Sequence, residues 1–247
     1  MKENYKKILK ATVKIEAGVS AGSGFHFMDN HTLITNAHVV ESAITKNDKI
    51  YARIDNDRYE LTPMFISKDD TNDFVILKSS SSFPSDRELL HVANDDNYDI
   101  GTEVLFSGFP HGVDDLVVQK AIIAGNCNGN PNEFYLDGSV NNGNSGGPII
   151  RLYDNSIIGI VTAKRFIKGK LENLVNNVNR FKDLATEQSK YVAMSLGGIN
   201  YNVEMARCLA DITNIFNEVV LRNANTGIGI GQKIMNAFDE YHKLEQH

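Results

Sequence analysis

Short runs of strand-forming residues, broken by turn residues at roughly every tenth position, dominate the sequence up to residue 163 and constrain its fold most. Turn signals such as those at 29–30, 55–57 and 154–155 separate the runs. This rhythm predicts an all-β sandwich or barrel, with side chains facing closed interiors so that few sheet edges are exposed. The candidate strands are Thr12–Ala17, Gly24–Met28, Thr32–Thr35, Lys49–Arg53, Glu60–Ile66, Phe74–Lys78, Glu103–Ser107, Val117–Ala124, Glu133–Asp137, Gly147–Arg151 and Ser156–Ala163.

The apolar period changes near residue 165. From Leu171 to Leu184, and again from Val203 to Val219, apolar residues recur at spacings of three and four, which predicts two amphipathic helices separated by the glycine pair at 197–198. The glycine-rich stretch 226–231 returns to an extended texture. A last short helix is expected from about Gln232 to Leu244.

Composition excludes several classes of function. The chain is 42% hydrophobic and 23% charged, as in soluble globular proteins, and its net charge of −6 leaves no electrostatic footprint for nucleic acid. No apolar run is long enough to span a membrane. Cysteine and histidine show no metal-ligand spacing and no phosphate-binding glycine loop occurs, so neither a metal nor a cofactor is expected. Two cysteines, and no signal-peptide core after Met1, favour a cytoplasmic location.

The turn Gly143–Pro148 holds a serine, Ser145, between glycines and directly before an apolar stretch. A serine hydroxyl becomes a useful nucleophile only when a base takes its proton and hydrogen-bond donors stabilise the resulting oxyanion. Glycines adopt positive φ at little cost, so they allow backbone N–H groups to converge on one point. Taken alone, the same pattern is equally typical of a tight turn before a strand.

A base and an orienting carboxylate are available upstream. His38 follows a candidate strand, and Asp73 lies where a polar loop enters the apolar run Phe74–Leu77. Such a position can bury a carboxylate beside an imidazole. Each residue alone has a simpler interpretation, His38 as a surface or core histidine and Asp73 as a loop acid. The order His38, Asp73, Ser145 is the order found in chymotrypsin-type enzymes.

Five ordered stretches together make the sequence resemble the trypsin-like (chymotrypsin-fold) serine peptidases, most closely the HtrA (DegP-like) branch without a PDZ domain. The resemblance covers residues 12–163 and resumes near Asn225. The stretches are Ala21–Phe25, Leu33–Val40, Asn72–Lys78, Gly108–Gly112 and Asp137–Pro148.

This resemblance implies a fold of two six-stranded antiparallel β-barrels. The N-terminal barrel would span about 11–85, and the C-terminal barrel about 90–163 plus 225–247. Both would belong to a single trypsin-like peptidase domain, 1–247. Residues 165–224 would form a helical hairpin inserted in the second barrel, and a helix would end the chain.

The resemblance also implies the roles of the site residues. Ser145 would attack the scissile carbonyl, His38 would take its proton, and Asp73 would hold the imidazole. The N–H groups of Gly143 and Ser145 would form the oxyanion hole. Asn144, just before the nucleophile, has no charge to pair with a newly cut N-terminus, so activation by that ion pair is not expected.

Substrate preference is implied by position as well. Ser139, Val140 and Lys164 would line the pocket for the side chain preceding the cut. None of them is acidic, which disfavours Lys or Arg there. Val140 favours a small or medium aliphatic residue, whereas Lys164 would either pair with an acidic residue or extend to solvent.

The sequence therefore predicts a serine endopeptidase that acts on proteins or peptides through an acyl-enzyme. The competing interpretation is a catalytically silent protein that keeps the fold for binding or regulation. A third is an enzyme that stays latent until a partner orders the oxyanion loop. The insertion would either cover and stabilise the barrel or bind a regulatory partner or a second copy.

Overall fold

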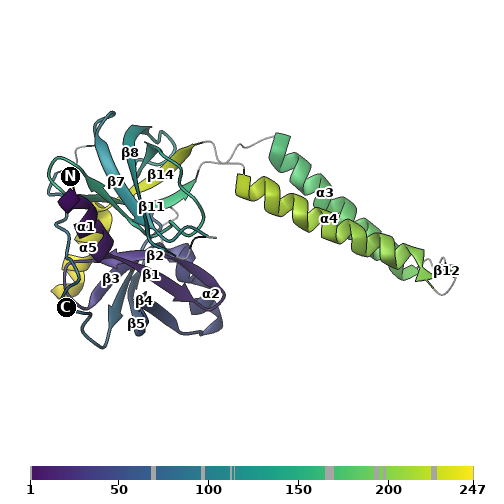
Figure 1. The fold of residues 1–247 in the computed structure, drawn as a ribbon, viewed down its shortest axis with the longest axis horizontal. Helices are drawn as coiled ribbons and strands as arrows, with labels where there is room; N and C mark the ends of the chain where they lie inside the picture. The colour runs from purple at the N-terminus through teal and green to yellow at the C-terminus, as the bar shows by residue number, and fades with distance from the viewer. Residues whose placement is uncertain are drawn as a thin grey trace. The chain divides into compact units, whose positions relative to one another are not determined.

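The computed structural model describes residues 2–67, 71–95, 98–111, 113, 115–164, 170–191, 195–196, 199–223 and 227–246. Gly112, the glycine pair at 197–198 and Asn225 lie outside the described residues. The chain divides into two compact units (Figure 1). One unit combines Met1–Arg165 with Gly227–His247, and the other is Phe166–Thr226. We call them the barrel unit and the hairpin unit.

The barrel unit contains two closed antiparallel barrels of six strands each, which confirms the predicted fold class. In order around the first barrel, the strands are β1 (Thr12–Ala17), β2 (Ser20–His26), β3 (Thr32–Thr35), β6 (Val75–Ser79), β5 (Asp57–Ile66) and β4 (Ile50–Ile54). The second barrel consists of β10 (Pro148–Arg151), β11 (Ile157–Lys164), β14 (Ile228–Lys233), β9 (Glu133–Asp137), β8 (Val117–Asn126) and β7 (Glu103–Gly108).

Alternation along the strands fills each barrel. In β1, Val13, Ile15 and Ala17 are buried within the core of the first barrel. Phe134 and Leu136 of β9 do the same in the second barrel. Successive side chains of a strand point to opposite faces, so this period-two pattern directs one face inward.

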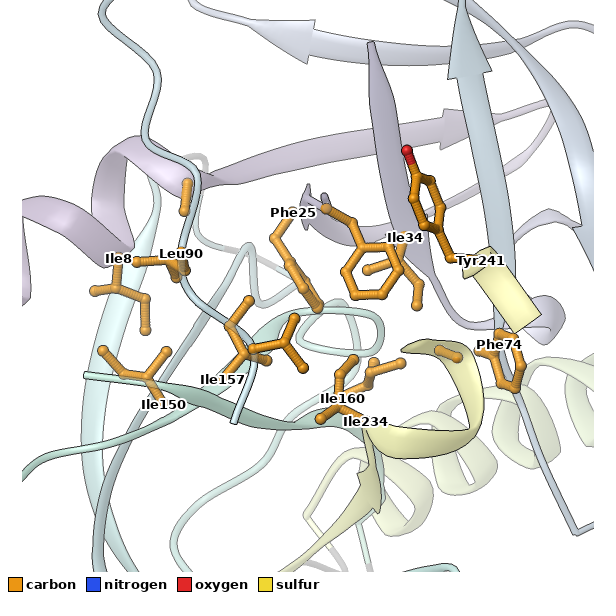
Figure 2. Packing of buried hydrophobic residues seen from close by; sticks show 14 of the residues in the cluster. Ile8, Phe25, Ile34, Phe74, Leu90, Ile150, Ile157, Ile160, Ile234 and Tyr241 are labelled. Carbon is orange, nitrogen blue, oxygen red and sulfur yellow. The ribbon is translucent and has the colours of Figure 1, made fainter. Parts of the chain in front are cut away.

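A third core lies between the barrels and is covered by two helices, α1 (Lys2–Ala11) and α5 (Met235–Glu245). Figure 2 shows Phe25 of the first barrel and Ile160 of the second meeting there, with Ile8 of α1 and Tyr241 of α5 at its margin. The sequence predicted α5 but neither α1 nor α2 (Ala37–Lys46), the helix that begins beside His38. The shared core fixes one barrel against the other.

The hairpin unit consists of α3 (Lys170–Tyr191) and α4 (Tyr201–Asn223), which run side by side (Figure 1). The two short strands β12 (Ser195–Leu196) and β13 (Ile199–Asn200) pair at the turn between them. β11 and β14, which precede and follow the hairpin in the chain, are neighbours in the second barrel. The helical insertion within that barrel is therefore confirmed. Within the described residues, no helix has the length and apolar character needed to cross a bilayer.

Candidate active site

Ser145 sits in the turn that leads into β10, and glycines shape that turn. Gly143 has φ +93° and Gly146 has φ +88°, in the region that side chains disfavour. A Cβ atom at Gly143 would collide with the Phe109 carbonyl oxygen, and one at Gly146 with the Ser23 carbonyl oxygen. Both glycines are therefore required by backbone conformation and by close packing.

Sheet register brings His38 and Asp73 together. β3 and β6 pair so that Thr35 lies opposite Val75, which places the segment after β3 beside the segment before β6. His38 Nδ1 lies 2.5 Å from Asp73 Oδ2, and the His38 backbone N–H donates to Asp73 Oδ1 at 3.1 Å. An ionised carboxylate only accepts hydrogen bonds, so Nδ1 carries the proton and Nε2 presents its lone pair. Within the described residues Nε2 has no partner.

The Ser145 turn reaches the same place from the second barrel. The Ser145 hydroxyl donates to the Thr162 carbonyl at 3.1 Å, and the Asn36 amide, two residues before His38, bonds the Thr162 hydroxyl at 3.4 Å. The structure thus brings all three predicted triad residues to one junction of the barrels. A direct bond from the Ser145 hydroxyl to His38 is not formed among the described residues, which is common in substrate-free sites.

The expected oxyanion donors are two backbone N–H groups in the Ser145 turn. Across the described residues, neither the Gly143 N–H nor the Ser145 N–H has a hydrogen-bond partner. The Asn142 carbonyl accepts from the His111 N–H at 2.7 Å. A trans peptide points its carbonyl and its N–H in opposite directions, so the Gly143 N–H faces away from His111.

Ser23 of β2 supports this turn, and sequence reasoning did not single it out. Its hydroxyl is fully buried, donates to the Gly143 carbonyl at 2.6 Å and accepts from the Phe109 N–H at 2.9 Å. Its backbone N–H donates to the Ser145 carbonyl at 2.8 Å. Ser23 therefore anchors the turn from the opposite barrel. Its place in the matching stretch 21–25 was the only available signal.

Asp73 has support that the sequence also did not reveal. Its N–H donates to the side-chain oxygen of Gln232 at 2.9 Å, and its carbonyl accepts from Asn36 at 2.6 Å. Gln232 lies on β14, beyond the insertion, and is buried. No local pattern could have linked residues 159 positions apart.

Two of the three residues expected to line the substrate pocket differ in burial. Ser139 is exposed, whereas Val140 is buried within the core of the second barrel and packs on Gly229. Lys164 ends β11, and its side chain lies outside the described part of the structure. A separate pocket of about 350 Å³ borders His38 and Asp73. No group of three His, Cys, Asp or Glu side chains that could hold a metal is found in the described residues.

Asn144, which lies within the turn Gly143–Pro148, is buried. Its side-chain oxygen has no hydrogen-bond partner among the described residues and lies against Gly108. The Ser145 turn is held instead by the bonds from Ser23 and by close packing of its glycines.

Comparison with known proteins agrees with this architecture. A family model described as trypsin-like peptidase domain matches residues 22–160. The chain is 36% identical over 146 residues to a probable periplasmic serine endoprotease, DegP-like, of Pseudomonas fulva, covering 57% of this chain and 28% of that protein. A protein of the same description from Hahella chejuensis is 33% identical, with coverage of 57% and 29%. The chain thus matches less than a third of the length of these relatives.

Solved structures share the fold. The serine endoprotease from Yersinia pestis superposes with a TM-score of 0.56 at 23% identity, covering 66% of this chain and 57% of that one. The protein Rv3671c from M. tuberculosis, in an inactive form with a serine-to-alanine change, gives a TM-score of 0.53 at 24% identity, with coverage of 66% and 78%.

The expected cytoplasmic location is wrong, because the relatives are named as periplasmic proteins. Few cysteines say little about compartment, since an oxidising environment permits disulfides without requiring them. The N-terminal stretch is part of the fold. It forms α1, whose Ile8 is fully buried.

Proposed function

The chain belongs to the trypsin-like peptidase family, and from that premise we propose that it is a serine endopeptidase working through Ser145, His38 and Asp73. The main support for this proposal is the 2.5 Å contact between His38 Nδ1 and Asp73 Oδ2. It leaves His38 Nε2, on the side of the Ser145 turn, without a partner among the described residues. A binding protein has no need for an imidazole held in that tautomer.

In the proposed reaction, a turn of the Ser145 side chain away from Thr162 brings its hydroxyl to His38 Nε2. Nε2 takes the proton as the oxygen attacks the scissile carbonyl, and the imidazolium is stabilised by Asp73. The same proton then passes to the leaving amine, which departs and leaves an acyl-enzyme on Ser145. Water repeats the sequence, releasing the acid and restoring the serine.

The oxyanion of each tetrahedral intermediate would be held by the N–H groups of Gly143 and Ser145. Supporting this, both donors lack a partner among the described residues and the Asn142 carbonyl is turned to His111. Preorganised donors at this point account for a large part of catalysis in acyl transfer. The same features support an oxyanion hole that is already formed. They argue against the alternative in which the enzyme stays latent until a partner binds.

The substrates would be proteins or peptides with a small or medium aliphatic residue before the cut. The absence of an acid among Ser139, Val140 and Lys164 supports this. A peptide-library cleavage profile tests it, and a preference for Arg, Lys, Asp or Glu at that position would refute it.

Labelling with a fluorophosphonate probe tests the activity itself. We expect rapid modification of the wild-type chain at Ser145, located by peptide mass spectrometry, and no modification of Ser145→Ala. Labelling that appears only after a partner is added would favour the latent form. No labelling under any condition would favour the catalytically silent binding protein.

Regulation would reach the enzyme through the insertion 165–224, by a partner protein or by self-association. Its place in the chain supports this, because it directly follows the expected pocket residue Lys164 at the end of β11. Replacing the insertion with a short linker and measuring peptide hydrolysis tests the claim, and unchanged activity and association would remove it.

A further inference from the structure

α4 has two rows of residues that are suited to helix packing, and α3 occupies only one. Ala206 and Thr213 belong to the buried row. The other row, which we call the outer seam, is exposed. Its members follow one another at spacings of four, three, four and three: Tyr201, Met205, Cys208, Ile212 and Ile215. This is the spacing of a helix that packs against another helix by knobs into holes.

α3 contributes to the same face. Phe181 and Leu184 of α3, together with Met205 and Leu209 of α4, line a groove of about 350 Å³ between the helices. Phe181 is 61% exposed and Leu184 is 53% exposed. Met205 belongs to both the outer seam and the groove, so the two adjoin and together form one exposed surface of the hairpin unit.

We propose that this surface binds the same surface of a second copy of the chain, so that two hairpins close into a four-helix bundle. Two helices alone cannot bury such a face, and pairing two hairpins is a common solution. Six large apolar side chains here are each more than half exposed, which amounts to on the order of 600 Å² of apolar area. A stable interface buries about 800 Å² per partner.

Charge favours a second copy as the occupant. The helix segments 170–191 and 201–223 carry six basic and six acidic residues, so the net charge of −6 resides in the rest of the chain. Two neutral hairpins approach without repulsion. An anionic membrane surface would instead call for a polar face rich in Lys and Arg, and a strongly charged partner would call for the opposite charge.

The symmetry of such a pair has a specific consequence for Cys208. Identical faces meet about a two-fold axis, so each contact occurs twice except where a residue lies on the axis. Cys208 is at the middle of the outer seam and is exposed, whereas Cys127, the other cysteine, is buried. An axis through the middle of the seam places Cys208 against the partner's Cys208.

Sedimentation velocity on the full chain, between about 1 and 100 μM, tests the proposal. We expect a dimer that Ile212→Glu weakens at least 100-fold by placing a charge in the seam. Val203→Glu is the matched control: the same helix, the same new charge and an exposed apolar residue, but off the seam. It should leave the dimer intact. A wild-type chain that stays monomeric throughout, or equal weakening by both substitutions, would overturn the proposal.

Cross-linking with a short bismaleimide gives a second readout that needs no peptidase activity. A covalent dimer should form in the wild type, disappear in Cys208→Ser, and decline in Ile212→Glu in step with the sedimentation result. Monomeric protein that instead binds vesicles of anionic lipid would assign the surface to a membrane and refute self-association. Failure of fluorophosphonate labelling would leave these measurements unaffected, so the two proposals fail separately.

Discussion

The barrel unit and the hairpin unit differ in how much of their apolar side-chain surface they bury. In the barrel unit, three cores hold large side chains such as Phe25, Phe106 and Phe134 with no exposed surface. In the hairpin unit, Ala206 is the only buried hydrophobic residue among those whose burial is described. Most of its large apolar residues whose burial is described are exposed, Phe181 and Met205 among them.

This difference matches two separate requirements, precise positioning of atoms for catalysis and accessible apolar surface for recognition. Catalysis needs atoms held within a fraction of an ångström, and the site residues lie where two filled barrels meet. Recognition needs accessible apolar surface, which a fully closed core cannot provide. The hairpin unit keeps that surface, and its insertion between β11 and β14 leaves the pairing of those strands intact.

The largest expected effect is on kcat, and it appears when removal of a hydroxyl group in the barrel unit is compared with removal of one in the hairpin unit. Ser145→Ala should lower kcat by at least about a thousandfold, because the proposed nucleophile is lost. Thr213→Ala removes a buried hydroxyl from the hairpin unit and should change kcat less than about twofold. Steady-state hydrolysis of a peptide substrate measures both. Comparable losses in the two variants would mean that catalysis depends on the hairpin as much as on the barrels.

Truncation of one phenylalanine in each unit is the next test. Phe134→Ala should destabilise the barrel unit by about 3–5 kcal/mol, because it leaves a cavity in a closed core. Phe181→Ala should lower the free energy of unfolding of the hairpin unit by less than about 1 kcal/mol at protein concentrations too low for association. Calorimetry separates the units, which need not unfold in one transition. A large effect of Phe181→Ala on the barrel transition would show that the units are coupled.

Ser23→Ala sharpens the contrast within the barrel unit. The variant loses the bonds to the Gly143 carbonyl and the Phe109 N–H, so the oxyanion donors should be held less well. We expect kcat to fall about 10- to 100-fold with KM little changed. Affinity for a peptide aldehyde, which forms the tetrahedral adduct, should fall in parallel.

Ser107→Ala is the control for that variant. Ser107 is equally buried, and its hydroxyl lies 2.6 Å from the Thr12 hydroxyl rather than against the Ser145 turn. It should lower the melting temperature and leave kcat unchanged. A proportional loss of kcat and stability in both variants would reduce Ser23 to a structural role.

Sequence alone predicted the barrel strands well because their signal is local. β1, β3 and β9 have the predicted bounds, and the other predicted strands shift by a few residues at their ends. α1 and α2 were not predicted. Both helices are short, so they depend on tertiary packing, with Ile8 and Val40 buried against the barrels. A local sequence pattern does not reveal such packing.

The candidate site divides in the same way. His38, Asp73 and Ser145 stand in local motifs, and the structure brings them to one junction. Ser23 and Gln232 act through contacts across more than a hundred residues, so no periodicity marks them. The outer seam was hidden for a different reason: a helical pattern shows which residues are apolar but not which of two apolar rows is covered.

The smallest expected effect is a loss of stability in acid that is confined to the barrel unit. His26 is fully buried against Phe83, with ring centroids 4.8 Å apart, and neither ring nitrogen has a partner among the described residues. Burial, with a further contribution from the Arg87 charge, lowers the pKa of His26 from 6.5 to about 4. The helices of the hairpin unit contain no histidine.

The sign follows from proton binding. The unfolded chain protonates this imidazole below about pH 6.5, whereas the native state keeps it neutral down to about pH 4. Between those values the unfolded state binds more protons, so the free energy of unfolding falls as the pH falls. At pH 5.5 the loss of unfolding free energy relative to pH 8 is on the order of 1 kcal/mol.

His26→Phe should abolish this component while keeping the ring contact with Phe83. Urea unfolding of wild type and variant at pH 8, 6.5 and 5.5 measures it, because titrations common to both proteins cancel in the difference. An equal loss of stability in the variant would assign the acid response to other groups. A loss that follows the hairpin transition rather than the barrel transition would contradict the separation of the two units, since no hairpin helix contains a histidine.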